Sequence, residues 1–234
     1  MANLWAFGDS WVYGDGVNAN ETFASYLADD FELSCISFGQ SGMSNTDILN
    51  KLQRNLPFIS KDDFIIICWT SPHRDEYSNS YNRRRLAENK KYFLTLLPQQ
   101  IRLAETLLSG YNLIMTQAFN PIFGYDYIVD DSYTPSSFIE WGKPNNTLVD
   151  IITYNWCEDN KNNFFMSKTP LELPHRGYFS SDNKHPSPIG HRLIADKLSE
   201  YTNNKFFKSK NKKVNRNIDN PENKKLLWVK NELI

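Results

Sequence analysis

The most constraining feature of this sequence is the run from Phe64 to Trp69, in which every residue is apolar (Phe-Ile-Ile-Ile-Cys-Trp). An uninterrupted apolar run is typical of a strand that is buried on both faces of a sheet. Strands with one face in water usually alternate between apolar and polar residues instead. The run therefore predicts a parallel sheet that is covered by helices on both faces.

Strand and helix patterns alternate through the first half of the chain. Apolar runs predict further strands at residues 4–7, 33–38 and 111–116, and helical spacing of apolar residues predicts helices at residues 22–27, 45–56, 84–108 and from Pro188 onward. Ser44 is expected to cap the second of these helices, with Asp47 completing a capping box. Such alternation is typical of βαβ units, so we expect an α/β protein: a three-layer α/β/α sandwich with a mainly parallel central sheet. In such sheets the ligand site lies at the carboxyl ends of the strands.

The length of 234 residues is suitable for one domain of this class. We assign residues 1–201 to this domain, with an insertion at about residues 119–180 that is rich in Pro, Asn and aromatic residues. Residues 202–234 form a basic tail with nine Lys or Arg residues against three acidic ones. We expect a partly disordered or docked extension and favour it over contact with nucleic acid.

The cysteines and the N-terminus indicate a cellular compartment. Cys35 and Cys68 lie inside predicted strands, which favours buried free thiols. No basic segment followed by an apolar one opens the chain, and no run approaches the ~18 apolar residues of a membrane span. We therefore expect no transmembrane segment and a cytoplasmic location. The net charge of -1 indicates no particular partner, and the sequence leaves the oligomeric state open.

Two short motifs carry residues suited to nucleophilic catalysis. Gly8-Asp9-Ser10 directly follows the first predicted strand, and residues 182–186 read Asp-Asn-Lys-His-Pro before the last helix. A serine hydroxyl is a poor nucleophile until a neutral imidazole can take its proton, and a carboxylate fixes the tautomer of that imidazole. Each motif also has a plain structural reading, because Gly-Asp-Ser is a common turn and residues 182–186 can be a solvated turn before a capped helix.

In this order the two motifs resemble the nucleophile block and the late Asp-x-x-His block of the SGNH (GDSL-like) hydrolases. The resemblance covers about residues 3–118 and 178–200. It implies a flavodoxin-like SGNH hydrolase fold and a catalytic triad in which Ser10 is the nucleophile, His185 the base and Asp182 its carboxylate partner. It also implies an acyl-enzyme intermediate and no requirement for a metal or an organic cofactor.

A third segment, residues 37–45, resembles the glycine block after the second strand of the same family. The resemblance implies that the backbone N–H groups of Ser10 and Gly42 form an oxyanion hole, although Gly42 can also be a simple turn glycine. The family's Gly-x-Asn-Asp block is missing after the third strand, where residues 70–74 read Thr-Ser-Pro-His-Arg. The side-chain donor to the oxyanion hole is therefore open; the candidates are Asn45, Ser71, His73 and Arg74.

Other residues compete for these roles. Ser41 is a rival nucleophile because residues 39–42 approach the Gly-x-Ser-x-Gly elbow of α/β hydrolases, but the second glycine comes one residue early. The histidines at positions 73, 175 and 191 lack an aspartate at the family spacing, and His191 is expected to be a surface or packing residue of the last helix.

Three further residues are expected to contact the substrate: Asp9, Trp11 and Arg74. For Arg74 the expected partner is an anionic group of the substrate, and the alternative is an ion pair with Asp75 or Glu76.

The leading functional hypothesis is a serine esterase that hydrolyses a small-molecule, glycan or lipid ester, with a small acyl or acetyl group favoured. The alternative is an SGNH scaffold that has lost turnover and acts as a binding or structural protein. The altered block after the third strand supports this alternative. A third hypothesis, nucleic-acid binding, depends on the basic tail alone.

Overall fold

The central element of the computed structural model is one parallel sheet of four strands. The structure describes residues 2–71, 74, 90–118, 136–137, 148, 179–180 and 185–206. The strands are β1 (Asn3–Gly8), β2 (Ser34–Ser37), β3 (Phe64–Trp69) and β4 (Asn112–Gln117), and their order in the sheet is β2-β1-β3-β4. All three neighbouring pairs are parallel. This order agrees with the flavodoxin-like arrangement, and the predicted α/β fold with a parallel central sheet is confirmed.

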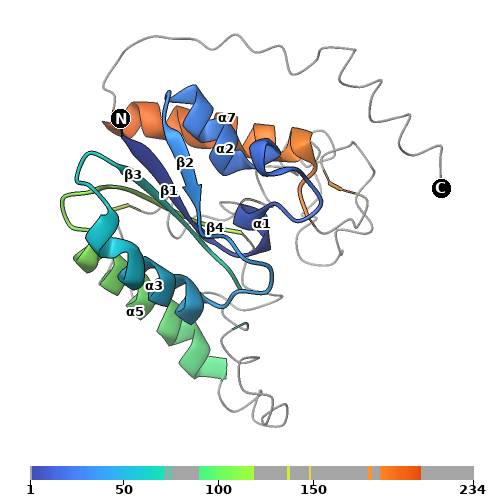
Figure 1. Cartoon of the computed structure of the whole chain (residues 1–234). Helices are drawn as coiled ribbons and strands as arrows, with labels where there is room; N and C mark the ends of the chain where they lie inside the picture. Colours follow the sequence, from blue (N-terminus) through green and yellow to red (C-terminus); the bar gives the residue numbers. More distant parts are fainter. Residues whose placement is uncertain are drawn as a thin grey trace, which may run out of the picture.

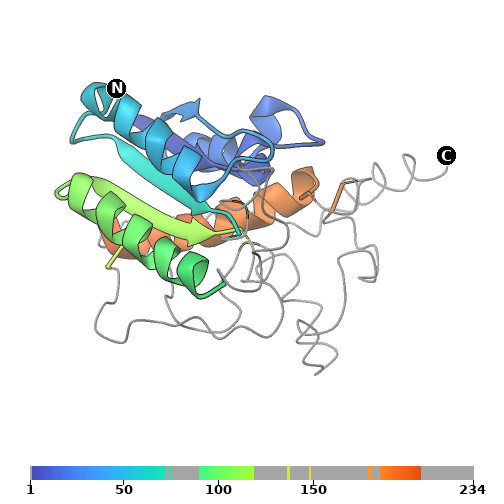
Figure 2. The ribbon, with the colours of Figure 1, turned by 90° about the horizontal axis from the view of Figure 1, so that it is seen from below.

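Helices cover both faces of the sheet. The described helices are α1 (Ser10–Tyr13), α2 (Phe23–Asp30), α3 (Asn45–Asn55), α5 (Lys90–Leu107) and α7 (Pro188–Phe206), with short 3-10 turns at Ala19–Glu21 and Leu56–Phe58. Figures 1 and 2 show α2 and α7 on one face of the sheet and α3 and α5 on the other. The predicted three layers are therefore present.

The apolar run that opened the sequence analysis is buried as expected. Alternate residues of β3 point to opposite faces: Ile66 packs in the core cluster under α2 and α7, while Ile65 and Ile67 pack in the cluster under α3 and α5. Each of these three isoleucines is at most 1% exposed. Both faces of the strand thus lie in apolar cores, which explains why polar residues are absent from the run.

The helix ends follow the sequence signals. Ser44 accepts a hydrogen bond from the backbone of Asp47, and the carboxylate of Asp47 accepts one from the backbone of Ser44, which confirms the predicted capping box. Helix α5 is followed by Gly110 with a φ of 81°, a left-handed conformation that glycine adopts easily. The predicted start of this helix at residue 84 lies outside the described residues.

The last helix extends further than the sequence indicates. Helix α7 ends at Phe206, so the predicted domain boundary at residue 201 falls inside it. Thr202 is 1% exposed, and the ring of Phe206 packs edge-on against Phe64 at 5.8 Å. These contacts tie the end of α7 to the sheet. The rest of the predicted tail, residues 207–234, lies outside the described residues.

The predicted buried free thiols at Cys35 and Cys68 can be compared with the structure. Cys35 and Cys68 are both free thiols; Cys68 is buried as expected, whereas Cys35 is half-buried. Burial raises the pKa of both thiols.

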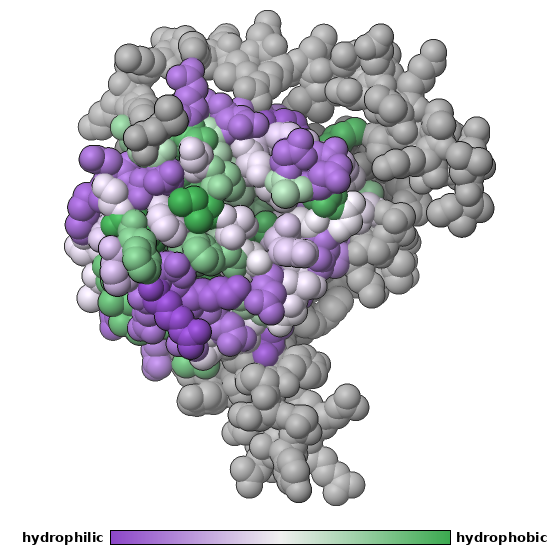
Figure 3. Space-filling model, in the orientation of Figure 1, coloured by the Kyte–Doolittle hydropathy of each residue, from purple (hydrophilic) through white to green (hydrophobic). Residues whose placement is uncertain are grey.

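Figure 3 shows apolar groups exposed between the two helical layers, on the face viewed in Figure 1. Within the described part of the chain, no helix is long and apolar enough to cross a membrane.

Candidate active site

Ser10 sits on a tight turn between the first strand and the first helix. The carboxylate of Asp9 caps α1 by accepting a 3.0 Å hydrogen bond from the backbone N–H of Trp11. The carbonyl of Ser10 accepts hydrogen bonds from the N–H groups of Gly14 (2.9 Å) and Asp15 (3.1 Å). Ser10 therefore lies at the carboxyl end of β1, where parallel sheets place their ligand sites. Its side chain is 2% exposed, and Oγ has no hydrogen-bond partner among the described residues.

The loop after β2 packs directly against this turn. A Cβ atom at Gly39 would lie 2.3 Å from the backbone nitrogen of Tyr13, so only glycine permits the approach. The N–H of Gln40 also donates a 3.2 Å hydrogen bond to the carbonyl of Gly8. The glycine block and the Ser10 turn, predicted from separate segments, thus lie side by side.

Gly42, the predicted backbone donor, has a φ of 75°, and a Cβ atom there would meet no atom within 4 Å. The hydroxyl of Ser41, the rival nucleophile, donates a 2.5 Å hydrogen bond to Oδ2 of Asp15. The backbone of Gly42 is therefore next to open space, whereas the Ser41 hydroxyl is engaged by a carboxylate. The role of Gly42 in an oxyanion hole stays a prediction.

Asp9 connects the Ser10 turn to the end of β3. Its side chain is completely buried, and Oδ2 accepts a 2.6 Å hydrogen bond from Oγ1 of Thr70. Nη1 of Arg74 lies 3.6 Å from the same oxygen. Burial raises the pKa of Asp9, although the hydrogen bonds from Thr70 and Trp11 and the charges of Arg74 and His185 oppose this rise. A buried carboxylate with these partners holds neighbouring loops in place.

The predicted substrate contacts of Asp9, Trp11 and Arg74 have to be weighed against their burial. Asp9 and Trp11 are both 0% exposed, and Trp11 packs in the core cluster under α2 and α7. The side chain of Arg74 is 27% exposed and pairs with Asp9. The alternative partners proposed from the sequence, Asp75 and Glu76, lie outside the described residues. Substrate contact by these three residues stays a prediction, and for Asp9 and Trp11 it would require a change in packing.

Asn45, Ser71 and Arg74 are the described candidates for the side-chain donor of an oxyanion hole, and Arg74 pairs with Asp9. Oδ1 of Asn45 accepts a 2.8 Å hydrogen bond from the N–H of Thr70, and its Nδ2 donates a 3.1 Å hydrogen bond to the carbonyl of Thr70. One hydrogen of the Nδ2 group is left for another acceptor. Ser71 is 8% exposed, and its Oγ has no hydrogen-bond partner within the described part of the chain. His73, the other neutral candidate, lies outside the described residues.

The loop that carries His185 reaches the Ser10 turn through Asp15. The carbonyl of His185 accepts hydrogen bonds from the backbone N–H (2.8 Å) and from Oγ (3.1 Å) of Ser180. Ser180 in turn borders Gly16, where a Cβ atom would lie 3.1 Å from its Oγ. Nε2 of His185 lies 3.6 Å from Oδ2 of Asp15, whose N–H is bonded to the carbonyl of Ser10. The structure thus brings the predicted base to the loop of the predicted nucleophile.

Two parts of the predicted site need separate mention. Asp182 lies outside the described residues, so the complete triad stays a prediction. Asp15 and Thr70, in contrast, were not singled out from the sequence. The available signals were the position of Asp15 between Gly14 and Gly16, shortly after Ser10, and the position of Thr70 directly after the third strand.

His191 is a packing residue, one of the two roles that the sequence suggested for it. It is 0% exposed, and its ring stacks on Phe23 at 6.0 Å. Its Nδ1 accepts a 3.2 Å hydrogen bond from the backbone N–H of Phe23. Burial, together with the charge of His185, lowers the pKa of His191 to about 3. His191 is therefore neutral near pH 7 and belongs to the core between α2 and α7.

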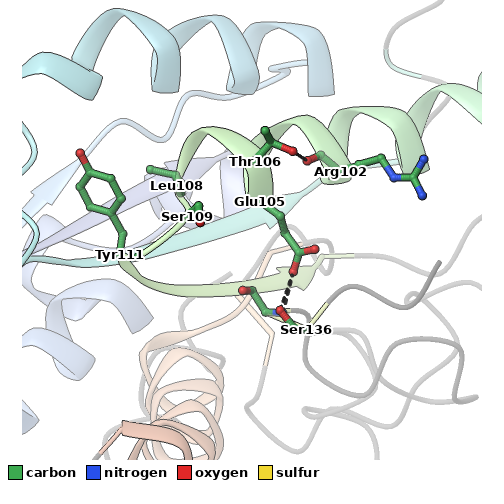
Figure 4. A pocket seen from close by; sticks show the side chains of 9 residues that line it. Arg102, Glu105, Thr106, Leu108, Ser109, Tyr111 and Ser136 are labelled. Carbon is green, nitrogen blue, oxygen red and sulfur yellow. Dashed lines mark hydrogen bonds between the residues drawn. The ribbon is translucent and has the colours of Figure 1, made fainter.

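A surface hollow lies beside the amino end of β4, away from Ser10 at the carboxyl end of β1 (Figure 4). It is lined by the end of α5, by the loop that leads into β4 and by residues 136 and 137. Glu105 points across it and accepts hydrogen bonds from Oγ of Ser136 (3.3 Å) and the N–H of Ser137 (2.8 Å). Because this hollow is at the amino end of β4, it is separate from the candidate active site.

The fold and the site together define an α/β protein with a buried serine hydroxyl and a histidine loop at the carboxyl edge of a parallel sheet. No protein-family model matches the chain, and no curated protein matches it. Its structure is similar to those of lipolytic proteins of the G-D-S-L family and of an SGNH hydrolase.

Three solved structures illustrate this similarity. The esterase EstA from Pseudoalteromonas sp. is 13% identical, with a TM-score of 0.47, and the match covers 89% of this chain and 100% of that one. A member of the lipolytic G-D-S-L family from Veillonella parvula is 16% identical, with a TM-score of 0.45 and coverage of 89% and 99%. A family two carbohydrate esterase from Clostridium thermocellum is 16% identical, with a TM-score of 0.46 and coverage of 88% and 64%. At these identities and TM-scores, the chemistry of the site has to be inferred from the residues of this chain.

Proposed function

We propose that this protein is a serine hydrolase of the SGNH type that hydrolyses a carboxylic ester. Ser10 is the nucleophile, His185 the general base and Asp182 the carboxylate that orients the base. The observation that carries the proposal is the Ser10 hydroxyl, which is buried at the carboxyl end of β1 and has no hydrogen-bond partner among the described residues. Buried hydroxyls are normally hydrogen-bonded, so an unpartnered one beside a histidine loop is suited to a reacting group.

The reaction proceeds in two steps. His185 takes the proton of the Ser10 hydroxyl while Oγ attacks the ester carbonyl carbon, and the tetrahedral intermediate expels the alcohol, which leaves with the proton from the imidazole. The product of this step is an acyl-enzyme on Ser10. Water then attacks the acyl carbon with His185 again acting as the base, which releases the carboxylic acid and restores the free serine.

The negative oxygen of each tetrahedral intermediate needs hydrogen-bond donors. In our proposal the backbone N–H groups of Ser10 and Gly42 supply two of them. The third donor is the side chain of Ser71 or of Asn45. Ser71 is favoured because its buried Oγ has no partner in the described residues, whereas the amide of Asn45 already holds both backbone groups of Thr70.

The alternative function is a binding or structural role for a scaffold without turnover. Its support is the loop after β3, where residues 70–74 read Thr-Ser-Pro-His-Arg and the family's Gly-x-Asn-Asp block is missing. The nucleophile distinguishes the two functions, because a binding protein has no need for a reactive hydroxyl at Ser10.

The test is covalent labelling with a fluorophosphonate probe, which reacts with activated serines. We expect the native chain and the Ser41→Ala variant to be labelled and Ser10→Ala to remain unlabelled. Ser41→Ala is the matched control because it removes the rival hydroxyl on the neighbouring loop. Labelling of Ser10→Ala, or no labelling of the native chain, would defeat the proposed activity and favour the binding role.

The substrate class follows from a second assay on the native protein that has not been exposed to the probe. A series of p-nitrophenyl esters from acetate to longer acyl chains measures kcat/KM against chain length. We propose a small acyl or acetyl group, so kcat/KM is expected to be highest for the short esters. A maximum at long chains would identify a lipid ester instead.

A further inference from the structure

The imidazole of His185 contacts a carboxylate that the proposed triad does not use. Nε2 of His185 lies 3.6 Å from Oδ2 of Asp15, and the same oxygen accepts the 2.5 Å hydrogen bond from Ser41. Nε2 is the nitrogen that must face the nucleophile in a Ser-His-Asp triad. Oγ of Ser10, meanwhile, has no hydrogen-bond partner among the described residues. In this structure Nε2 is thus next to Asp15 and makes no hydrogen bond with Ser10.

The position of Asp15 is fixed by its own loop. Asp15 lies between Gly14 (φ 85°) and Gly16 (φ 87°), two left-handed residues that reverse the chain directly after α1. Its N–H is bonded to the carbonyl of Ser10, and its carboxylate is bonded to Ser41. The carboxylate is therefore anchored from the backbone side and from the glycine loop, so it stays beside the imidazole.

We propose that Asp15 is a positioning residue for His185. Its carboxylate holds Nε2 of the imidazole in the resting protein, and the imidazole turns from Asp15 to the Ser10 hydroxyl for the reaction. The inference builds on the proposed serine hydrolase function. A protonated imidazole is attracted to the carboxylate, while a neutral one is free to turn to the serine hydroxyl.

The other charged groups that the structure describes near His185 occupy different positions. Asp9 lies at the end of β1, completely buried, and Arg74 neutralises it from the β3 side. His191, on α7, is buried and has a pKa of about 3, so it carries no charge at neutral pH. Asp182, which precedes His185 by three residues in the sequence and lies outside the described residues, is assigned to the other ring nitrogen in the proposed triad. Among the described residues, Asp15, with its side chain 25% exposed, is the carboxylate that lies near Nε2.

The test compares pH profiles of kcat/KM for p-nitrophenyl acetate in the native chain and in Asp15→Asn. The variant keeps the shape of the side chain and removes its charge. We expect the ratio of variant to native kcat/KM to be about two- to fivefold higher at about pH 5.5 than at about pH 8, in line with the strength of a partly exposed ion pair. A merely structural role would lower the ratio equally at both pH values, and that result, or a fall of the ratio in acid, would overturn the proposal.

Two further variants make the comparison specific. Asp62→Asn removes an exposed carboxylate just before β3, at the amino end of the strands, whereas His185 lies near their carboxyl ends. The ratio of Asp62→Asn to native kcat/KM is expected to be the same at both pH values. Ser41→Ala keeps the charge of Asp15 but removes its anchor. It should shift the profile in the same direction as Asp15→Asn and by less. A profile for Asp62→Asn that matches Asp15→Asn would also overturn the proposal, because the effect would then be one of net charge.

A second readout does not depend on turnover. The ring nitrogens of His185 can be followed by 15N NMR of the full chain, with His185→Gln used for assignment. Asp15→Asn is expected to move the Nε2 signal of His185, and Asp62→Asn to leave it in place. If the native chain fails to react with the fluorophosphonate, the proposed function is wrong. The NMR comparison still tests whether Asp15 contacts Nε2 of His185. An unmoved Nε2 signal in Asp15→Asn refutes the role of Asp15 whether or not the protein is an esterase.

Discussion

Oγ1 of Thr70 donates a 2.6 Å hydrogen bond to Oδ2 of Asp9, and this bond joins the loops that follow two neighbouring strands. Asp9 precedes Ser10 directly, and Thr70 is the residue after the end of β3. The backbone of Thr70 is held in turn by the amide of Asn45. The turn of the proposed nucleophile is thus held by residues from two other segments of the chain.

Removal of the Thr70 hydroxyl is expected to weaken the fold. Thr70→Val has nearly the same shape but leaves Oδ2 of the buried Asp9 without this donor, which should cost about 1–3 kcal/mol of unfolding free energy. Urea denaturation measures the change. Thr106→Val is the control, because its hydroxyl bonds to the carbonyl of Arg102 on the exposed face of α5 and should change stability by less than about 0.5 kcal/mol. Equal stability of the two variants would show that the Thr70 bond contributes nothing.

The two glycines of the loop after β2 should respond differently to alanine. At Gly39 a Cβ atom would lie 2.3 Å from backbone atoms of α1, so Gly39→Ala is expected to displace the loop or prevent folding. At Gly42 the space is open and the φ of 75° is the only obstacle, which costs about 1–2 kcal/mol. Thermal unfolding of both variants provides the comparison. The expectation fails if Gly42→Ala is the more damaging change.

Protonation of His191 should make the protein less stable in acid. Burial lowers the pKa of His191 to about 3 in the folded chain, while in the unfolded chain an ordinary imidazole titrates near 6.5. Between these two pKa values the unfolded chain binds a proton at His191 that the folded chain does not bind. The free energy of unfolding therefore falls as the pH drops from about 6.5 towards 3. Between about pH 7 and pH 5 the expected loss is about 2 kcal/mol.

The contribution of His191 can be isolated with His191→Gln. The measurement is the unfolding free energy at several pH values, and the slope between about pH 7 and pH 5 should be smaller in the variant. Asp9 contributes to the pH dependence with the opposite sign. Because burial raises its pKa, its protonation makes the folded protein more stable as the pH falls. Because Asp9 is present in both proteins, its effect cancels in the comparison. An identical slope would mean that another group causes the pH dependence.

Ser71 should affect turnover more than binding if it donates to the oxyanion. Ser71→Ala is expected to lower kcat by about 100-fold, the usual effect of removing one such donor, with little change in KM. The matched variant is Asn45→Asp, which keeps the shape of the rival donor and replaces its amide with a carboxylate. An unchanged kcat in Ser71→Ala would exclude Ser71 as the donor and leave Asn45, His73 and Arg74 as candidates. Folding of both variants is verified by circular dichroism before the comparison.

Much of the fold could be predicted from local sequence patterns. The limits of β3 agree with the apolar run, and the capping box at Ser44 marks the start of α3. Both signals depend on neighbouring residues in the chain, so they can be read without knowledge of the fold. The end of α7 could not be read in this way, because Thr202 and Phe206 are fixed by burial and by the ring of Phe64 on a distant strand.

The candidate site was only partly predictable for the same reason. The sequence by itself determined the parallel sheet and placed Ser10 at the carboxyl end of its first strand, since apolar runs and turn residues act over a few neighbouring positions. Only the tertiary structure decided that Asp15 faces His185 and that Thr70 bonds to Asp9, because each of these pairs joins residues far apart in the chain. A hydrogen bond or an ion pair requires its two groups to lie within a few ångströms, and that distance is set by the packing of the whole domain.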